Sequence, residues 1–365
     1  MNSVEFKNIS KVYGKQTLLK ETSFAVEAGT FTVIFGAPGC GKSVILRLLT
    51  GLEKPTSGEV FLRGENATSL SAGDRNIGYI PQSFALYPHY KVRDNIGYPL
   101  KLIGAPKSEI DDVVARTAEL LRITRLLDKY PNQLSGGEKQ RVAIARGIAK
   151  KTDIFIFDDP LTGLDFKLRE QLFDDLRSMQ ETLKATFIYT TSDPLEALML
   201  AEKIHVLDDG KVIEAGNIET VYHQPQHLRT ALLLGFPKIN TFDGTLEKDS
   251  KSIICKTKLF SFPVDLNQSE KSDNDQVVVA VRPQYLKLNE KPSGKSIFIN
   301  ANITLAEDLG GEMVIHMDAD GVYLLGVERH DSFSQQEGAV EIGVANQNLM
   351  VFDAKTSRRI GQGAN

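Results

Sequence analysis

The stretch Gly36-Ala37-Pro38-Gly39-Cys40-Gly41-Lys42-Ser43 decides the fold of this chain. It follows the apolar run 31–35 and precedes residues 42–52, whose apolar side chains recur at helical spacing. The order is therefore a buried strand, a glycine-rich loop and a helix. Glycines let the backbone N–H groups of such a loop converge on an anion, and the N-terminus of the helix adds its positive dipole end. The pattern G-x-x-x-x-G-K-[ST] in this context indicates a phosphate-binding loop of an α/β fold.

The chemistry of this loop predicts a nucleotide site. We expect Lys42 to bind the β- and γ-phosphates and Ser43 to bind Mg²⁺. A second apolar run, 153–158, ends in Asp158, whose carboxylate is a natural second ligand for that ion. Cys40 is interpreted as a small side chain that fills the loop. The predicted nucleotide-binding set is Gly36, Ala37, Pro38, Gly39, Cys40, Gly41, Lys42, Ser43 and Val44.

Composition narrows the class of protein. The chain has 365 residues, a net charge of −4, 41% hydrophobic and 25% charged residues, values typical of a globular protein with two domains. The acidic balance argues against nucleic acid as a partner. No apolar run approaches the roughly 18–20 residues of a membrane span, and the start does not resemble a signal peptide. Two cysteines make no disulfide framework, so we expect a cytosolic protein.

The pattern of apolar residues divides the chain in two. Up to about Gly235, strands alternate with helices, the latter expected at 108–124, 138–150, 166–183 and 194–201. Asp209-Gly210 between two apolar runs indicates a hairpin. Beyond about residue 240 we expect a mostly β domain, with a polar loop at 267–275 and strands at 252–255, 277–281, 297–305, 313–317 and 349–352.

A second motif, Leu134-Ser135-Gly136-Gly137-Glu138-Lys139-Gln140-Arg141, offers another anion site. A serine hydroxyl, two glycines and a helix that starts at about Glu138 present donors without side-chain obstruction. Ser135 could instead serve only as the N-cap of that helix. With this motif in the same chain as the phosphate loop, the sequence resembles the ABC-type ATPases, whose signature motif has this form.

The resemblance implies roles for further residues. Tyr13 resembles the aromatic residue that stacks on the adenine ring. Gln82, within 79–89, resembles the Q-loop glutamine, which contacts Mg²⁺ together with Ser43 and Asp158 and links the site to membrane subunits. In this family the signature and the D-loop complete the site of the opposite subunit in a head-to-tail dimer; the matching residues here are Ser135, Gly136, Gly137, Glu138 and Asp165.

The resemblance extends over nearly the whole chain to importer ATPases of the maltose and sugar-uptake type. It implies a P-loop ATPase domain at 1–235 with a helical insert at about 83–150, which receives the permease, and an OB-like β domain at 240–365 that aids dimerisation or regulation. It also implies ATP and Mg²⁺ as ligands and a peripheral place on the cytoplasmic face of the inner membrane. The implied partners are a second ATPase subunit, two permease subunits and an extracytoplasmic binding protein for a sugar, polyol, glycerol or glycerol phosphate.

Three positions depart from the family pattern. Asp159 stands where a glutamate normally polarises the attacking water, and its side chain is one methylene shorter. Ser192 replaces the switch histidine in a Thr-His-Asp context, and no histidine lies between His89 and His205. Val44 lacks a hydroxyl that many relatives place near the α-phosphate.

These departures affect residues that hydrolyse ATP more than residues that bind it. The sequence therefore suggests the degenerate half of an ATPase heterodimer, which binds ATP, hydrolyses it slowly and lends its intact signature to a second subunit. Two alternatives stay open: a homodimeric importer ATPase of low turnover, and an ATP-binding regulatory protein that never docks on a membrane.

Overall fold

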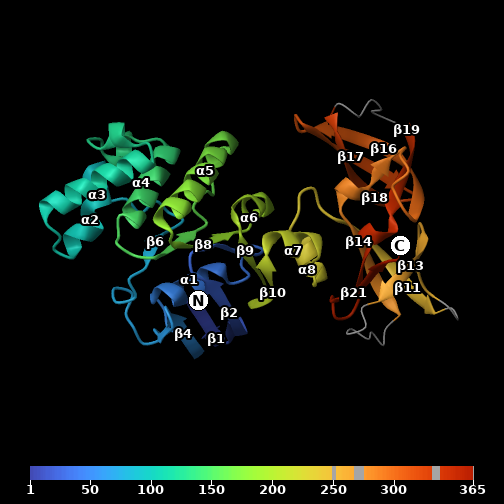
Figure 1. Ribbon diagram of the computed structural model, residues 1–365, viewed down its shortest axis with the longest axis horizontal. Helices are drawn as coiled ribbons and strands as arrows, with labels where there is room; N and C mark the ends of the chain where they lie inside the picture. Colours follow the sequence, from blue (N-terminus) through green and yellow to red (C-terminus); the bar gives the residue numbers. More distant parts are fainter. Residues whose placement is uncertain (249–251, 267–274, 331–337, 365) are drawn as a thin grey trace. The chain divides into compact units, whose positions relative to one another are not determined.

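The computed structural model describes residues 1–364 except 249–251, 267–274 and 331–337. The chain forms two compact units, Met1–Glu219 and Thr220–Asn365 (Figure 1). The polar loop expected at 267–275 lies outside the described residues, apart from its last position. Within the described residues, no helix is both long enough and apolar enough to cross a membrane.

A six-stranded sheet in the order β10-β9-β3-β8-β7-β6 forms the centre of the first unit. Five strands are parallel and β10 is antiparallel to β9, which confirms the α/β fold. The hairpin at Asp209-Gly210 is also confirmed, since both residues have positive φ, 44° and 75°. The strands are β3 (Phe31–Phe35), β6 (Gly78–Ile80), β7 (Ile154–Asp158), β8 (Thr186–Thr191), β9 (Lys203–Asp208) and β10 (Lys211–Asn217).

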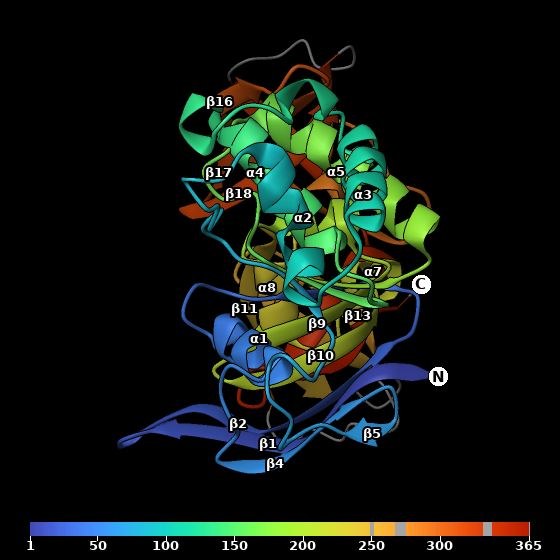
Figure 2. The same ribbon diagram turned by 90° about the vertical axis from the view of Figure 1, so that its left-hand side faces the viewer.

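An antiparallel sheet in the order β2-β1-β4-β5 packs beside the first helix, α1 (Lys42–Thr50). Figure 2 shows α1 between this sheet and the central one. A single apolar core joins all three elements; it includes Phe6 of β1, Leu48 of α1 and Ile156 of β7. The strands are β1 (Asn2–Tyr13), β2 (Gln16–Glu27), β4 (Ser57–Leu62) and β5 (Glu65–Asn66).

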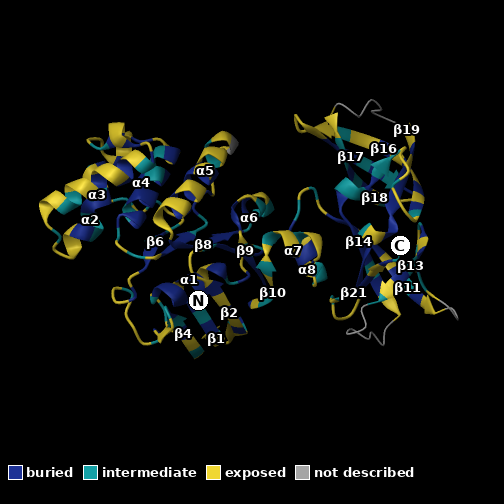
Figure 3. Ribbon diagram, viewed as in Figure 1, coloured by how far each residue is buried: buried dark blue, intermediate teal, exposed yellow. Residues whose placement is uncertain are grey.

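The segment between β6 and β7 is helical, as expected. It contains α2 (Val92–Leu102), α3 (Lys107–Leu120), the 3₁₀ turns η1 (Thr124–Leu126) and η2 (Pro131–Gln133), and α4 (Gly136–Ile148). The helices α5 (Phe166–Leu183) and α6 (Pro194–Leu200) cover the face of the central sheet opposite α1 (Figure 1). Figure 3 shows that the inner strands of the central sheet, such as β8, are buried while the outer surfaces of α3 and α5 are exposed.

The second unit is a β domain, as expected, and its closed barrel β11-β12-β13-β21-β20-β14 fits the OB-like prediction. A five-stranded antiparallel sheet, β15-β19-β16-β17-β18, shares one apolar core with the barrel. The elements are β11 (Asn240–Lys248), β12 (Ile253–Thr257), β13 (Ser261–Leu266), β14 (Gln276–Val281), η3 (Pro283–Tyr285), β15 (Lys287–Leu288), β16 (Ser296–Asp308), β17 (Glu312–Ala319), β18 (Val322–Arg329), β19 (Gly338–Ala345), η5 (Asn346–Asn348), β20 (Met350–Asp353) and β21 (Arg359–Gly363).

Two short helices precede the barrel, α7 (Ile218–His223) and α8 (Leu228–Leu233). Arg282, which follows β14 and is 1% exposed, binds their carbonyls: its Nη1 donates to Leu234 O at 2.9 Å and its Nε to Tyr222 O at 3.1 Å. Its guanidinium also lies 3.6 Å from the centre of the Tyr222 ring. These contacts group residues 220–235 with the second unit, whereas the sequence pattern put the division after residue 235.

Candidate functional site

The phosphate loop lies between β3 and α1, in the order that the sequence predicts. Gly36 has no space for a side chain, because a Cβ there would lie 2.2 Å from Leu207 O and 2.7 Å from Cys40 Sγ. Gly41 is the N-cap of α1, with φ 113° and no side-chain capping bond. Because glycine has no side chain to cap the helix, the first N–H groups of α1 can bind an anion.

Lys42 brings its charge into this loop. The side chain is buried, and Nζ donates to Gly36 O at 2.7 Å and to Ala37 O at 3.1 Å. Val44 behaves differently, since its side chain belongs to the apolar core beside α1. What Val44 offers a phosphate is its backbone N–H. Burial raises the pKa of the Cys40 thiol, in keeping with its role as a packed side chain of the loop.

Both carboxylate oxygens of Asp158, at the end of β7, accept hydrogen bonds. Tyr79 Oη of β6 donates to Oδ2 at 3.0 Å, and Thr190 Oγ1 of β8 lies 3.2 Å from Oδ1. Burial and the charge of Asp158 raise the pKa of Tyr79, so its hydroxyl stays protonated as a donor. Sequence reasoning named Asp158 but neither of its partners. The one available signal was a hydroxyl at position 79 in a short strand that leads into the Q-loop segment.

Asp159 has a backbone in the left-handed region, with φ 44°. Its N–H donates to Thr190 O at 3.2 Å and to Thr190 Oγ1 at 3.1 Å. Residues other than glycine rarely adopt this conformation, and aspartate is among those that do so most readily. Because the backbone is fixed here, the length of the side chain decides how far its carboxylate extends. Aspartate is one methylene shorter than glutamate.

Ser192 lies between two anchored residues in the loop from β8 to α6. Before it, Thr191 O accepts a hydrogen bond from Gly36 N at 3.3 Å. After it, Asp193 caps α6 through Leu195 N at 2.8 Å and accepts from Arg169 Nη1 of α5 at 2.8 Å. Position 192 is thus held beside the phosphate loop, and a serine there has a shorter side chain than a histidine.

The positions named from the sequence converge at one edge of the sheet. The phosphate loop, Asp158 and Asp159, and Ser192 follow β3, β7 and β8, which are neighbours in the sheet. Gln82 follows β6, the next strand, and is exposed. The carboxyl ends of parallel strands are where such α/β sheets bind ligands.

Tyr13 lies at the end of β1, and its side chain is fixed at the hydroxyl and on one face. The hydroxyl donates to Glu53, which also pairs with Lys11 at 3.1 Å and Arg47 at 3.2 Å. Lys11 Nζ lies 4.8 Å from the centre of the ring. Tyr13 as a whole remains 39% exposed, which leaves surface on which a flat base can stack.

The signature motif begins α4. Ser135 is its N-cap, the structural role left open by the sequence: Oγ accepts from Glu138 N at 3.3 Å, and Glu138 Oε2 accepts from Ser135 N at 3.0 Å. The two glycines differ in function. A Cβ at Gly137 would lie 2.0 Å from Leu168 Cδ2 of α5, whereas one at Gly136 would meet no atom of the described residues within 4 Å. Asp165 caps α5 in the same way, by accepting from Leu168 N at 3.0 Å.

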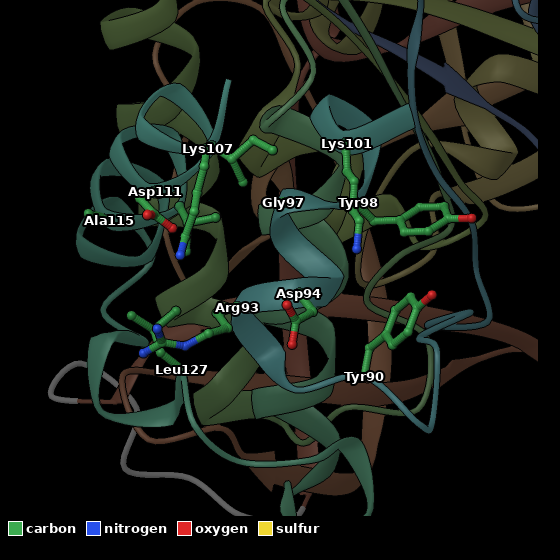
Figure 4. Close-up of a pocket in the computed structure, with 12 residues that line it drawn as sticks. Tyr90, Arg93, Asp94, Gly97, Tyr98, Lys101, Lys107, Asp111, Ala115 and Leu127 are labelled. Atoms are coloured by element: carbon green, nitrogen blue, oxygen red, sulfur yellow. The ribbon is translucent and has the colours of Figure 1, made fainter. Parts of the chain in front are cut away.

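A pocket of about 530 Å³ lies between α2 and α3, away from these residues (Figure 4). Its lining combines apolar side chains with charges of both signs: Tyr90, Arg93, Asp94, Gly97, Tyr98, Lys101, Lys107, Ile110, Asp111, Val114, Ala115 and Leu127. Beside it, the rings of Tyr87, Tyr90 and Tyr98 form a cluster with centroids 4.5–5.8 Å apart. The segment that leads from Gln82 to α2 carries the first two of these rings.

Comparisons with known proteins agree with this geometry. Residues 19–162 match a family model described as "ABC transporter". The chain is 35% identical over 379 residues to the maltose/maltodextrin import ATP-binding protein MalK of Photobacterium profundum, with 100% of both chains covered. It is 33% identical over 361 residues to an sn-glycerol-3-phosphate import ATP-binding protein, UgpC 2, of Agrobacterium fabrum, with 99% of this chain and 95% of that protein covered.

A solved structure also resembles the first part of the chain. It is the ATP-binding cassette MJ0796, in a dimeric post-hydrolysis state bound to ADP and Pi, with a TM-score of 0.54 and 30% identity. The match covers 59% of this chain and 98% of that one. The chain therefore belongs to the ABC transporter family, and it is one of the ATP-binding subunits of that family, which hydrolyse ATP.

Proposed function

We propose that this chain energises an importer of a sugar, polyol, glycerol or glycerol phosphate from the cytoplasmic face of the inner membrane. The observation that carries the proposal is the convergence of the phosphate loop, Asp158 and position 192 at the ends of β3, β7 and β8. The proposed substrate class is supported by the names of two relatives, one a maltose/maltodextrin import protein and the other an sn-glycerol-3-phosphate import protein.

In this proposal the first unit binds ATP with Mg²⁺. The N–H groups of 36–44 and the Lys42 ammonium hold the phosphates, and Tyr13 supports the adenine. Ser43, Asp158 and Gln82 supply hard oxygen ligands, which suit Mg²⁺ because this ion is commonly held by one or two carboxylates together with substrate phosphates. The bound ion would neutralise phosphate charge during transfer to water.

The same geometry supports slow hydrolysis at this site. The backbone of Asp159 is anchored to Thr190, so a carboxylate shortened by one methylene cannot approach by moving the chain. A misplacement of about 1 Å can lower a rate about 100-fold. Ser192 is held equally firmly, through Thr191 and Asp193, and has no titratable nitrogen. The partner-facing residues Ser135, Gly136 and Asp165 keep their ordered helix starts.

We therefore favour a heterodimer in which a second ATPase subunit carries the complete hydrolytic site and uses the signature of this chain. Two permease subunits and an extracytoplasmic binding protein complete the assembly. We propose that the α2–α3 pocket binds a short helix of the permease. Its lining combines apolar side chains with charges of both signs, and the segment that lines it comes shortly after Gln82 in the sequence. The β unit at the C-terminus serves dimerisation or regulation.

ATPase measurements on the purified chain test the degenerate site. We expect turnover about 100-fold or more below that of an intact importer ATPase, with Lys42→Ala as the background. In the homodimer alternative, Asp159→Glu combined with Ser192→His raises turnover. If the unmodified chain already matches an intact ATPase, the site is not degenerate; if the double variant gains nothing, the defect lies elsewhere.

Isolation from membranes tests the partners. An importer subunit co-purifies with permease chains and with a second ATPase, and ATP changes the strength of that association. Recovery only as a free chain, with no permease or second ATPase attached, would favour the alternative of an ATP-binding regulatory protein.

A further inference from the structure

Tyr79 is a half-buried tyrosine whose hydroxyl donates to the expected Mg²⁺ ligand Asp158. Removing a hydroxyl from water, even in part, costs free energy unless the hydroxyl finds a partner, and a phenylalanine would fill the same half-buried strand position without that cost. Asp158 Oδ2 is the partner found here, 3.0 Å away. The hydroxyl of Tyr79 is therefore expected to act on the Asp158 carboxylate.

The sheet explains why Tyr79 reaches Asp158. β6 and β7 are parallel neighbours, and Tyr79 is paired with Ile156, two residues before Asp158. Side chains two residues apart point to the same face of a strand, so the long tyrosine side chain lies along the face that carries Asp158. The aromatic ring supplies the length that this diagonal contact requires.

Thr190 holds the same carboxylate from the other side. β8 is the second neighbour of β7, and Thr190 is paired directly with Asp158. Its Oγ1 lies 3.2 Å from Asp158 Oδ1 and also accepts from Asp159 N at 3.1 Å. The torsion that rotates a carboxylate is broad, so a free carboxylate samples many orientations. Two donors from two strands remove that freedom.

We propose that Tyr79 is a positioning residue for the metal: together with Thr190, its hydroxyl fixes the orientation of the Asp158 carboxylate in which that group binds Mg²⁺. The inference rests on the proposed nucleotide site and deepens it. Hydrogen-bond partners of a ligating carboxylate orient it, and their removal typically costs about 10–100-fold in metal affinity. Tyr79 acts through Asp158 and does not itself touch the nucleotide.

Mn²⁺ affinity tests this role without reference to turnover. Mn²⁺ binding to the full chain is followed by electron paramagnetic resonance in the presence of saturating ADP. We expect Tyr79→Phe to weaken Mn²⁺ binding about tenfold, while ADP binding measured without a divalent ion stays unchanged. Thr190→Val is expected to weaken Mn²⁺ binding in the same direction, and Thr190→Ser, which keeps the hydroxyl, to restore most of it.

Tyr189→Phe is the matched control. It likewise removes a tyrosine hydroxyl that donates to a carboxylate: Tyr189 lies on β8, and its hydroxyl donates to Glu196 of α6 at 2.9 Å. We expect its Mn²⁺ affinity to match the unmodified chain. Unchanged Mn²⁺ affinity in Tyr79→Phe would overturn the proposal, and so would an equal loss in the control, which would show general loosening. If Tyr79→Phe does not fold, the two Thr190 variants decide the matter.

A failure of the proposed function gives a different result. In that case the unmodified chain binds neither ADP without metal nor Mn²⁺ with ADP, and Lys42→Ala changes nothing.

Discussion

At the scale of single residues, Gly36 shows how strictly the phosphate loop is built. An added Cβ would meet the backbone oxygen of Leu207 at 2.2 Å, and backbone of a buried central strand cannot move aside. We expect Gly36→Ala to displace the loop and to lower ATP affinity at least tenfold, measured by calorimetry. Gly73→Ala is the control, because its Cβ would meet only Ser71 Oγ at 3.8 Å. Normal ATP affinity in Gly36→Ala would contradict the packing argument.

His205 links stability to pH. It is 7% exposed on β9 and packs against Phe24 with ring centroids 5.1 Å apart, and its Nδ1 has no hydrogen-bond partner among the described residues. Burial lowers its pKa from 6.5 to about 4. The folded chain thus disfavours the protonated ring, and the stability it contributes above pH 6.5 is lost as the pH falls towards 4.

The resulting prediction concerns the free energy of unfolding of the first unit. Between pH 7 and pH 5, the His205 contribution falls by about 2 kcal/mol, since the unfolded ring is protonated while the folded ring is not. Urea titrations at both values, on the unmodified chain and on His205→Leu, isolate this contribution. The variant should lose less stability over that interval by about the same amount. An equal loss of stability in both chains would show that His205 takes up its proton as readily in the folded chain as in the unfolded chain.

At the scale of elements, the packing of α4 on α5 holds the signature motif in place. Gly137 lets the two helices approach, and one turn later Arg141 pairs with Asp175 of α5. The two side chains are 12% and 7% exposed. Removal of one member of a buried pair leaves the other charge without compensation.

We therefore expect Asp175→Asn to destabilise the first unit by about 3 kcal/mol, as measured by urea unfolding. Glu5→Gln is the control, because Glu5 pairs with Lys7 on the surface at 3.5 Å, and such pairs contribute about 0–1 kcal/mol. Similar small effects of both substitutions would mean that the helices are held by apolar contacts alone.

How far the sequence could predict these elements depends on their regularity. β3 and β7 are continuous apolar runs, since parallel strands are buried on both faces, and they were predicted. β1 and β2 were not predicted, because their pairing shifts register between Phe6 and Ile9 and again before Lys11, which breaks the alternation of a strand. Asn8 and Glu21 have positive φ at these irregularities.

The site shows the same division. Residues within continuous motifs, such as Lys42, Asp158 and Ser135, were predicted, because each motif carries its own local geometry. Tyr79, Thr190 and Arg169 act through contacts between neighbouring elements, and sequence spacing does not encode which strand lies beside which. The barrel was expected from the family resemblance and not from sequence spacing, since β13 closes it against a strand far along the chain, β21, with Val264 paired to Gly363.

At the scale of the whole molecule, each unit has its own apolar core. The second unit also includes α8, whose Leu228 and Ala231 pack with Phe352 of β20. Arg282 is buried within this unit, and its acceptors lie at residues 222 and 234. The shortest fragment of the second unit that folds stably should therefore begin before residue 222.

We expect a fragment of residues 220–365 to fold cooperatively, and a fragment of residues 240–365 to be at least about 3 kcal/mol less stable, since its buried guanidinium lacks partners. Chemical unfolding of both fragments measures the difference. Arg282→Met in the shorter fragment should recover part of the loss, because an apolar side chain needs no acceptor. Equal stability of the two fragments would show that Arg282 finds other acceptors.

The cap of α4 has a consequence for the proposed association with a second ATPase subunit. Ser135 Oγ receives the N–H of Glu138 on a lone pair, which leaves its own hydrogen unused by that bond. In the proposed dimer, this one oxygen can therefore cap the first turn of the helix and donate to a phosphate bound by the second subunit at the same time. Engagement and release need not unwind the first turn, so each encounter begins from a helix that is already ordered and loses no entropy in forming it again.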